Sequence, residues 1–126
     1  MPDKRPVARP PKTTEYEVLA ASKKVAETWD LWAATEPNAL AEAYDQLAQD
    51  PKAHSKRQTR LAGGYATGTY DGPTYDRWQY EVTAGGRVWY FVDDTPSGAG
   101  KRRRPGRVIV EKVFPGHPKG TERKNR

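Results

Sequence analysis

Arg87 stands at the start of an otherwise apolar run, GGRVWYFVDD (residues 85–94), which reads as a pair of turn glycines followed by a strand. A guanidinium group is a planar fork of N–H donors that matches the oxygens of a phosphate. Because strand side chains alternate between the two faces of a sheet, Arg87 shares a face with Trp89 and Phe91. The pattern predicts a cation aimed at a phosphate from an uncovered sheet face. The alternative is that Arg87 pairs with Glu81 across a hairpin.

Two residues near the carboxyl end could also act on a phosphate or a proton. The imidazole of His117 has an unperturbed pKa of about 6.5, so it could donate or accept a proton at neutral pH. Lys119 could hold the phosphate beside it. The alternative is that both are solvated tail residues, because the segment is proline-rich and shows no periodicity. His54 lies in a polar connection and is expected to be inert.

Two amphipathic helices are expected in the first half of the chain, after a short strand over residues 14–21. Ser22 can cap the first helix, and Glu36-Pro37 separates it from the second. Pro51 ends the second helix. Each helix carries one apolar stripe at helical spacing, formed by Val25, Trp29 and Trp32 in the first and by Leu40, Ala43, Tyr44 and Leu47 in the second. The two helices are expected to form an antiparallel hairpin.

Three strands are expected in the second half of the chain, over residues 77–82, 87–93 and 107–114, because apolar side chains there alternate. Residues 63–76 are glycine-rich and read as an irregular loop, as do residues 94–106. The order of elements predicts an α+β fold, in which an antiparallel sheet with an N-terminal strand carries the two-helix hairpin on one face. The opposite face is left uncovered by helices.

The alternation also predicts what lies on the uncovered face. Gln79 and Glu81 point to it from the first hairpin strand, and Arg87 is expected to be the only cation that the central hairpin turns to it. Trp89 and Phe91 would offer rings for unpaired bases, and each stacked base contributes about 1–3 kcal/mol. The competing explanation is that a partner protein covers these aromatic side chains.

Positive charge gathers toward the two ends of the chain, whose formal net charge is +6. Basic ends on an acidic middle are typical of proteins that bind polyanions, most often nucleic acid. A run of four cations in a glycine-rich loop is expected to contact a polyanion, with ribosomal RNA the natural candidate; it comprises Lys101, Arg102, Arg103 and Arg104. Arg57 and Arg60 could add cations before the hairpin. The alternative for such charges is plain solvation, which is preferred for residues 1–12.

Several classes of protein are excluded by composition. The chain has 126 residues and no cysteine, so it has neither a disulfide framework nor a thiolate metal site. Its apolar runs are too short to cross a bilayer, and its first residues lack the apolar stretch of a signal peptide. A cytoplasmic protein is expected. One domain over residues 14–122 is expected, between a disordered, basic and proline-rich tail (1–13) and a short flexible basic tail (123–126).

Three stretches resemble the RelE/ParE toxin superfamily. RLAGG (residues 60–64) resembles the family's basic turn before the central hairpin, and WQYEVTAGGRVWYFVDD (78–94) resembles its signature hairpin. VIVEKVFPGHPKGTE (108–122) resembles its last strand, followed by a segment that often carries a catalytic histidine or tyrosine. The resemblance is strongest over residues 78–94 and implies a RelE-like fold.

In the RelE branch, the resemblance implies a toxin of a type II toxin-antitoxin system. Such a toxin is an endoribonuclease that cuts messenger RNA on the ribosome without a metal or another cofactor. The 2′-hydroxyl attacks the adjacent phosphate, so the site needs cations for the charged intermediate and a proton donor for the leaving oxygen. The resemblance assigns Arg87 to the phosphate and His117 to proton transfer, and Glu81 could serve as general base, as carboxylates do in some relatives. It also implies a cognate antitoxin as the partner.

One departure from the family pattern keeps other functions open. The best-known RelE members carry two lysines on the first hairpin strand, where this chain has Gln79 and Glu81. Glu81 could act as the base, or it could cancel the charge of Arg87 and leave the site without catalytic activity. The alternatives are therefore a non-enzymatic inhibitor of DNA gyrase in the ParE manner and a RelE-fold binding protein whose site has decayed.

Overall fold

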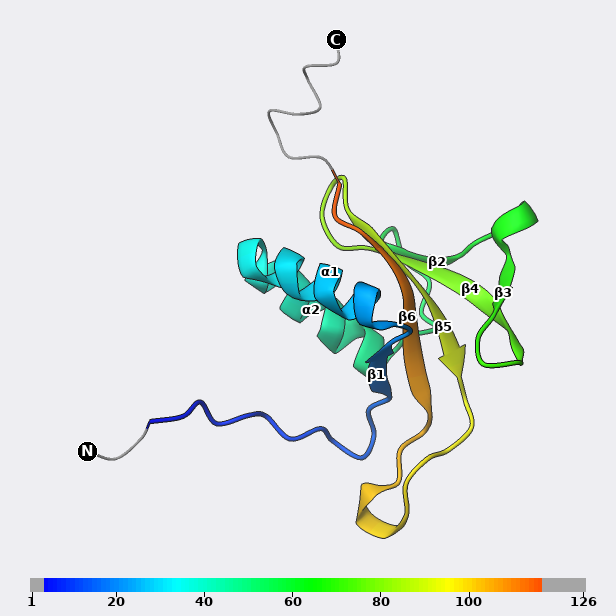
Figure 1. The fold of residues 1–126 in the computed structure, drawn as a ribbon. Coiled ribbons are helices and arrows are strands. Elements are labelled where there is room, and N and C mark those ends of the chain that lie inside the picture. The colour runs from blue at the N-terminus through cyan, green and yellow to red at the C-terminus, as the bar shows by residue number, and fades with distance from the viewer. Residues whose placement is uncertain (1–3, 117–126) are drawn as a thin grey trace.

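The computed structural model describes residues 4–116 and has two layers (Figure 1). Helices α1 (Lys23–Thr35) and α2 (Pro37–Gln49) lie side by side on one face of a sheet. This arrangement confirms the predicted α+β fold with a two-helix hairpin on one face. No helix in the described part of the chain is long and apolar enough to cross a membrane.

The helix boundaries follow the local signals in the sequence. The side-chain oxygen of Ser22 accepts a hydrogen bond from the backbone N–H of Val25 at 3.2 Å, so it caps the first turn of α1. Pro37 stands in the first turn of α2, where its missing N–H costs no helical hydrogen bond. A single residue, Glu36, therefore separates the two helices.

The sheet has the strand order β1-β6-β5-β4-β2, and β3 pairs with β4 outside this path. Its strands are β1 (Glu17–Ala20), β2 (Gln58–Arg60), β3 (Thr67–Thr69), β4 (Thr74–Glu81), β5 (Arg87–Asp93) and β6 (Arg107–Phe114). The pairs around β4 and β5 are antiparallel, as predicted, whereas β1 runs parallel to β6. A parallel pair needs a long connection, and here most of the chain separates the two strands.

Two short strands lie where the sequence predicts no strand. The expected irregular loop over residues 63–76 instead contains β3, which forms an antiparallel pair with the first half of β4. Likewise, β2 pairs with the second half of β4 at the edge of the sheet. Three residues are too few to show an alternating pattern, so their pairing partner decides their conformation.

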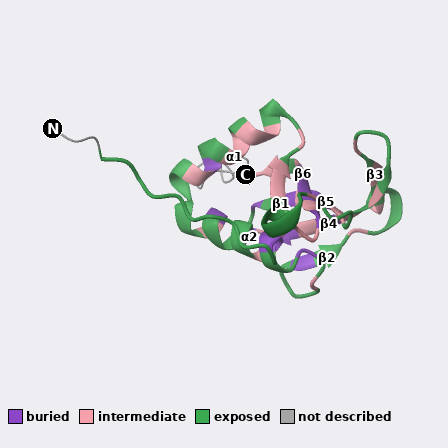
Figure 2. Cartoon of the chain, turned by 90° about the horizontal axis from the view of Figure 1, so that it is seen from below, coloured by how far each residue is buried: buried purple, intermediate pink, exposed green. Residues whose placement is uncertain are grey.

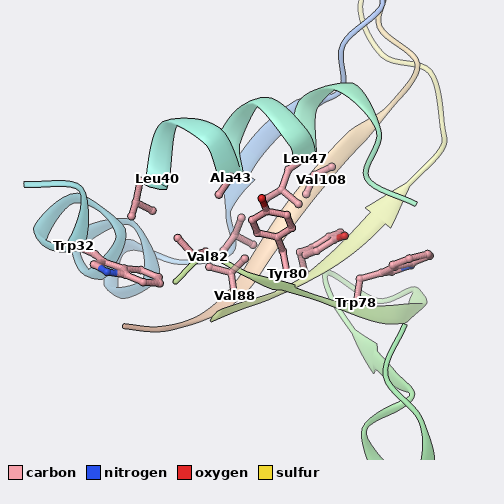
Figure 3. Close-up of a cluster of buried hydrophobic side chains, with 11 residues drawn as sticks. Trp32, Leu40, Ala43, Leu47, Trp78, Tyr80, Val82, Val88 and Val108 are labelled. Carbon is pink, nitrogen blue, oxygen red and sulfur yellow. The ribbon is translucent and has the colours of Figure 1, made fainter. Parts of the chain in front are cut away.

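The hydrophobic core lies between the helices and the sheet (Figures 2 and 3). The two alternating stripes of the central hairpin face it as predicted, with Trp78, Tyr80, Val82, Val88 and Tyr90 all buried. The helices contribute Trp32, Leu40, Ala43 and Leu47. This packing leaves the other face of the sheet without helices, and we call it the helix-free face.

A buried hydrogen-bond network ties this core to the connection after α2. The Tyr90 hydroxyl donates to the carbonyl oxygen of Pro51 at 2.8 Å and accepts from Gln58 Nε2 at 2.9 Å. Gln58 is 1% exposed, and its Nε2 also donates to the Asp50 carbonyl. Burial raises the pKa of Tyr90, so the hydroxyl keeps its proton and stays a donor.

The Tyr90→Phe variant is expected to lose about 2 kcal/mol of stability. The change removes one hydroxyl and leaves a buried donor of Gln58 and the Pro51 carbonyl without a partner, which costs about 1–3 kcal/mol. Urea denaturation of both proteins measures the difference. Tyr44→Phe, at a tyrosine of α2 that is 38% exposed, is the matched control and should change stability by less than about 0.5 kcal/mol. Equal effects of the two variants would contradict the proposed role of the network.

The segment just before β1 is held against α2 by contacts of Arg9. The guanidinium of Arg9 contacts Glu15 at 3.1 Å and Asp45 at 3.6 Å. The backbone N–H of Lys12, followed by Arg9, holds the pKa of Glu15 below its usual range. Glu15 therefore stays ionised and anchors this segment.

Candidate functional site

Two rows of side chains cross the helix-free face at the end of the sheet where β5 begins. The first row joins Glu81 of β4 and Arg87 of β5 to Phe114 of β6. The second row joins Gln79 and Trp89 to Lys112. Neighbouring strands lie about 4.8 Å apart, so each row spans a distance that one nucleotide could cover.

Arg87 is exposed at the centre of the first row. Its guanidinium carbon lies 4.8 Å from the ring centroid of Phe114, which supports the side chain by a cation–π contact. Glu81 is its direct partner in register, yet no ion pair joins Arg87 to a carboxylate of the described chain. The alternative of a cross-strand pair with Glu81 is therefore not observed, and the guanidinium N–H groups point to no protein acceptor within residues 4–116.

Lys112 is a second cation on this face, and the sequence reading missed it. Strict alternation from the buried Val108 and Val110 would turn Lys112 toward the core. A β-bulge instead makes Glu111 an extra residue, since Tyr90 pairs with Val110 while Trp89 pairs with Lys112. The lysine is consequently exposed beside Trp89. The one signal in the sequence is the break in alternation at VEKVF, where Val113 takes the inward position.

Arg57 and Arg60 lie at different places, although the sequence groups them. The carbonyl oxygen of Arg57 accepts a hydrogen bond from the Glu81 N–H at 2.7 Å, so Arg57 sits beside the first row at the sheet edge. Arg60 pairs in register with Trp78, whose face carries the core. It forms an ion pair with Asp76 at 3.4 Å. Of the two, only Arg57 adjoins the candidate site.

Phe91 is 1% exposed, which corrects the expectation that it offers a ring for base stacking. The β3 arm, residues 61–73, folds over this part of the helix-free face. Tyr75 stacks on Phe91 with ring centroids 5.7 Å apart. A Cβ at Gly68 would lie 2.8 Å from the Phe91 ring, so only glycine lets the arm approach this closely. Phe91 belongs to a small second core.

Trp89 is half-buried and held in one orientation beside this second core. Its Nε1–H donates to the side-chain oxygen of Gln79 at 2.9 Å. Its ring meets Phe114 edge-on at 5.1 Å and Tyr65 of the β3 arm at 5.4 Å. Tyr65 is 61% exposed, and sequence reasoning missed it because its segment reads as a loop. Trp89 and Tyr65 therefore form the accessible aromatic part of the site.

Arg77 also points to the helix-free face, so Arg87 is not the only cation that the central hairpin turns there. Its Nε and one terminal nitrogen donate to the two carboxylate oxygens of Glu111 at 2.7 and 2.8 Å. The other terminal nitrogen donates to the carbonyl oxygens of Tyr65 and Thr67. Glu111 raises the pKa of Arg77 above its already high ordinary value. The charge is neutralised, and Arg77 acts as a strut for the β3 arm.

The remaining predicted site residues lie elsewhere. His117 and Lys119 fall outside the described residues. His54 packs against Trp78 with ring centroids 5.1 Å apart, away from the helix-free face. Lys101–Arg104 belong to the loop between β5 and β6, at the other end of β5 from Arg87 (Figure 1). Seven strand residues separate these ends by about 20 Å. The structure thus does not bring the basic loop to Arg87.

The described part of the chain forms no metal site. Residues 4–116 contain no group of three or more histidine, cysteine, aspartate or glutamate side chains that could hold an ion. The site has two exposed cations, Arg87 and Lys112, with Arg57 nearby. It also has one carboxylate, Glu81, and two aromatic rings. Such a set can hold a phosphate, accept a proton and stack a base.

Comparison with known proteins gives a match at the level of structure. No family model matches the sequence, and no curated protein matches it either. Among solved structures, the chain is similar to a YoeB/ParE toxin from Agrobacterium tumefaciens, with a TM-score of 0.50 and 19% sequence identity. The match covers 81% of this chain and 99% of that one. This likeness supports the resemblance seen in the hairpin sequence, and the chain has the fold of the RelE/ParE toxins.

Proposed function

We propose that this chain is the toxin of a type II toxin-antitoxin system and acts as an endoribonuclease on messenger RNA. The observation that carries the proposal is the pair of exposed cations, Arg87 and Lys112, beside Glu81 on the helix-free face. They occupy diagonal positions on adjacent strands, about 7–8 Å apart. That spacing lets both groups contact the non-bridging oxygens of one phosphate.

The reaction that fits these groups is internal transesterification. Glu81 takes the proton of a ribose 2′-hydroxyl, and the 2′-oxygen forms a bond to the adjacent phosphorus. Negative charge grows on the phosphate oxygens, where Arg87 and Lys112 stabilise it. The bond to the 5′-oxygen then breaks, and that oxygen takes up a proton. His117 is the proton donor we assign on the sequence alone.

Base recognition is assigned to the two accessible rings beside the cations. Trp89 is held by Gln79 and Phe114, so stacking on it requires little further ordering of the side chain. Tyr65, in the 3-10 turn of the β3 arm, contacts Trp89, so its exposed ring extends the aromatic surface on which bases can stack. Stacking accepts any base, so it positions the strand without demanding one sequence.

A cognate antitoxin is the proposed protein partner. An active ribonuclease of this kind must be restrained in the cell that makes it. An acidic antitoxin segment over Arg87 and Lys112 would neutralise both cations and exclude RNA. The ribosome is the proposed place of action, since the resemblance is to the branch that cuts translated messages.

A second candidate function is binding without catalysis, in the manner of gyrase-blocking ParE toxins or of a decayed RelE-fold protein. The observation that favours it is Glu81, which stands directly opposite Arg87 and lowers the positive charge at the phosphate position. In that case the helix-free face would be a docking surface, and neither Glu81 nor His117 would be needed for toxicity.

Mapping of RNA 5′ ends after induction separates these functions. We expect new ends inside translated coding regions soon after wild-type expression, and Glu81→Gln should reduce their number about 100-fold, as loss of a general base does. Glu27→Gln on the exposed side of α1 is the matched control and should cleave like wild type. Growth arrest with intact messages and altered plasmid supercoiling would favour the gyrase function instead. A harmless chain without new ends would overturn the toxin proposal.

A further inference from the structure

Two basic segments meet at the end of the sheet away from Arg87. Lys12 belongs to the segment before β1, and Lys101–Arg104 belong to the loop between β5 and β6, at the lower end of the sheet in Figure 1. Two hollows of about 690 and 610 Å³ lie between these segments. Thr13, Lys101 and Arg104 line both of them. Lys12 lines neither hollow, so the cations that line them come from the loop, and we call Lys101–Arg104 the basic end.

The cations of the basic end differ from their neighbours in having no carboxylate partner. Arg9 contacts Glu15, Lys52 contacts Asp94 and Arg107 contacts Asp93. By contrast, Lys101–Arg104 form no ion pair with any residue between 4 and 116. Glu17 is the carboxylate that lines one hollow. Four cations against one carboxylate leave a strongly positive surface.

The loop that carries four of these cations has a defined fold. Ser97 and Arg104 exchange two backbone hydrogen bonds of 3.2 and 2.7 Å, which close the loop. A 3-10 turn over Gly100–Arg102 lies between them. Gly98 has a φ of 79° and packs against the Arg102 carbonyl, so the turn depends on glycine there. The cations are therefore presented from an ordered turn, which lowers the entropic cost of binding.

The lining of the hollows favours a phosphate backbone over a protein partner. Apart from the charged residues, it consists of proline, threonine, serine and glycine. Protein interfaces depend on large apolar or aromatic anchors, and none lines these hollows. Arginine forks match phosphate oxygens and need no such anchor. We propose that the basic end is a second binding site that takes the phosphate backbone of RNA, independently of the cation pair at Arg87 and Lys112.

The separation of about 20 Å between the two sites gives the second one a distinct role. A single phosphate cannot contact both, so the basic end does not take part in the reaction proposed above. It would hold RNA outside the reacting nucleotide, either ribosomal RNA or a remote part of the message. The inference goes beyond the proposed function, because RNA binding at this end requires no cleavage.

The test measures RNA binding in a background that does not cleave. In Arg87→Ala protein, the affinity for a labelled 20-nucleotide single-stranded RNA is measured by fluorescence anisotropy at several salt concentrations. Each phosphate contact contributes about 0.7 to the log–log salt slope on single strands. Changing Lys101, Arg102 and Arg103 to alanine should therefore lower the slope by about 2. Adding Arg104→Ala, at a residue that lines both hollows, should lower it by about 0.7 more.

A charge-matched control separates a site from general attraction. Changing Lys23, Lys24 and Lys56 to alanine removes the same charge from exposed positions elsewhere, and the slope should change by less than about 0.5. Co-sedimentation with ribosomes repeats the comparison for ribosomal RNA. A lower salt slope of the basic-end variant with either RNA supports the proposal and identifies which RNA this surface binds. Equal slopes for the two triple variants with both RNAs would overturn the proposal. If the basic-end variant alone failed to form a soluble complex with its antitoxin, the surface would be assigned to an acidic protein instead.

Discussion

Arg87→Ala is expected to reduce RNA cleavage and growth inhibition at least about 100-fold, while the protein stays folded. Removing one preorganised donor to a developing oxyanion costs a factor of about 100–1,000 in rate. The guanidinium is exposed, and it contacts the ring of Phe114. Its loss should therefore change the free energy of unfolding by less than about 1 kcal/mol. Growth curves after induction, cleavage of a translated message and circular dichroism on each protein measure the three quantities.

Two further variants make this result specific to the guanidinium. Arg87→Lys keeps the charge but cannot form two parallel hydrogen bonds to a phosphate, so intermediate activity is expected. Lys23→Ala removes an exposed charge from the start of α1 and should be as toxic as wild type. Full toxicity of a folded Arg87→Ala protein would exclude the assignment of Arg87 to the phosphate. The helix-free face would then be interpreted as a docking surface without catalysis.

The largest loss of stability is expected for Arg77→Ala. This change leaves the Glu111 carboxylate, whose side chain is 18% exposed, without its bidentate partner. It also removes the donors to the Tyr65 and Thr67 carbonyls that hold the β3 arm. Breaking a buried ion pair costs about 3–5 kcal/mol, and the partial exposure here places the cost near 3. The melting temperature should fall by about 10 °C or more, which calorimetry measures.

Two comparisons show whether the loss of stability comes from the Glu111 carboxylate that is left without a partner. In Arg77→Met with Glu111→Leu, no buried charge remains, so part of the stability should return. Arg60→Ala removes an arginine from the exposed pair with Asp76, where both side chains are about half exposed. That control should cost less than about 1 kcal/mol. If Arg77→Ala were as stable as Arg60→Ala, Arg77 would not be the strut that holds the β3 arm over Phe91.

The sequence by itself determined the elements whose signals are local. Helical spacing of Trp29 and Trp32, the Ser22 cap and the Glu36-Pro37 break predict α1 and α2 almost to the residue. Strict alternation in the central hairpin predicts which side chains enter the core. Both signals depend on residues a few positions apart, which is the range over which periodicity reports on burial. Arg87 was found from its position in the same strand, where period-two geometry puts it on one face with Trp89 and Phe91.

Only the tertiary structure decided which side chains remain available on the helix-free face. Phe91 and Trp89 are equivalent in the pattern, yet the β3 arm buries Phe91 and leaves Trp89 partly open. The bulge at Glu111 moves Lys112 to this face, and strand pairing across the sheet sets that bulge. Arg77 is neutralised by a carboxylate 34 positions along the chain. Contacts between distant segments leave no periodic trace in the sequence, so burial, pairing and the separation of Arg87 from the basic end emerge only when the chain is folded.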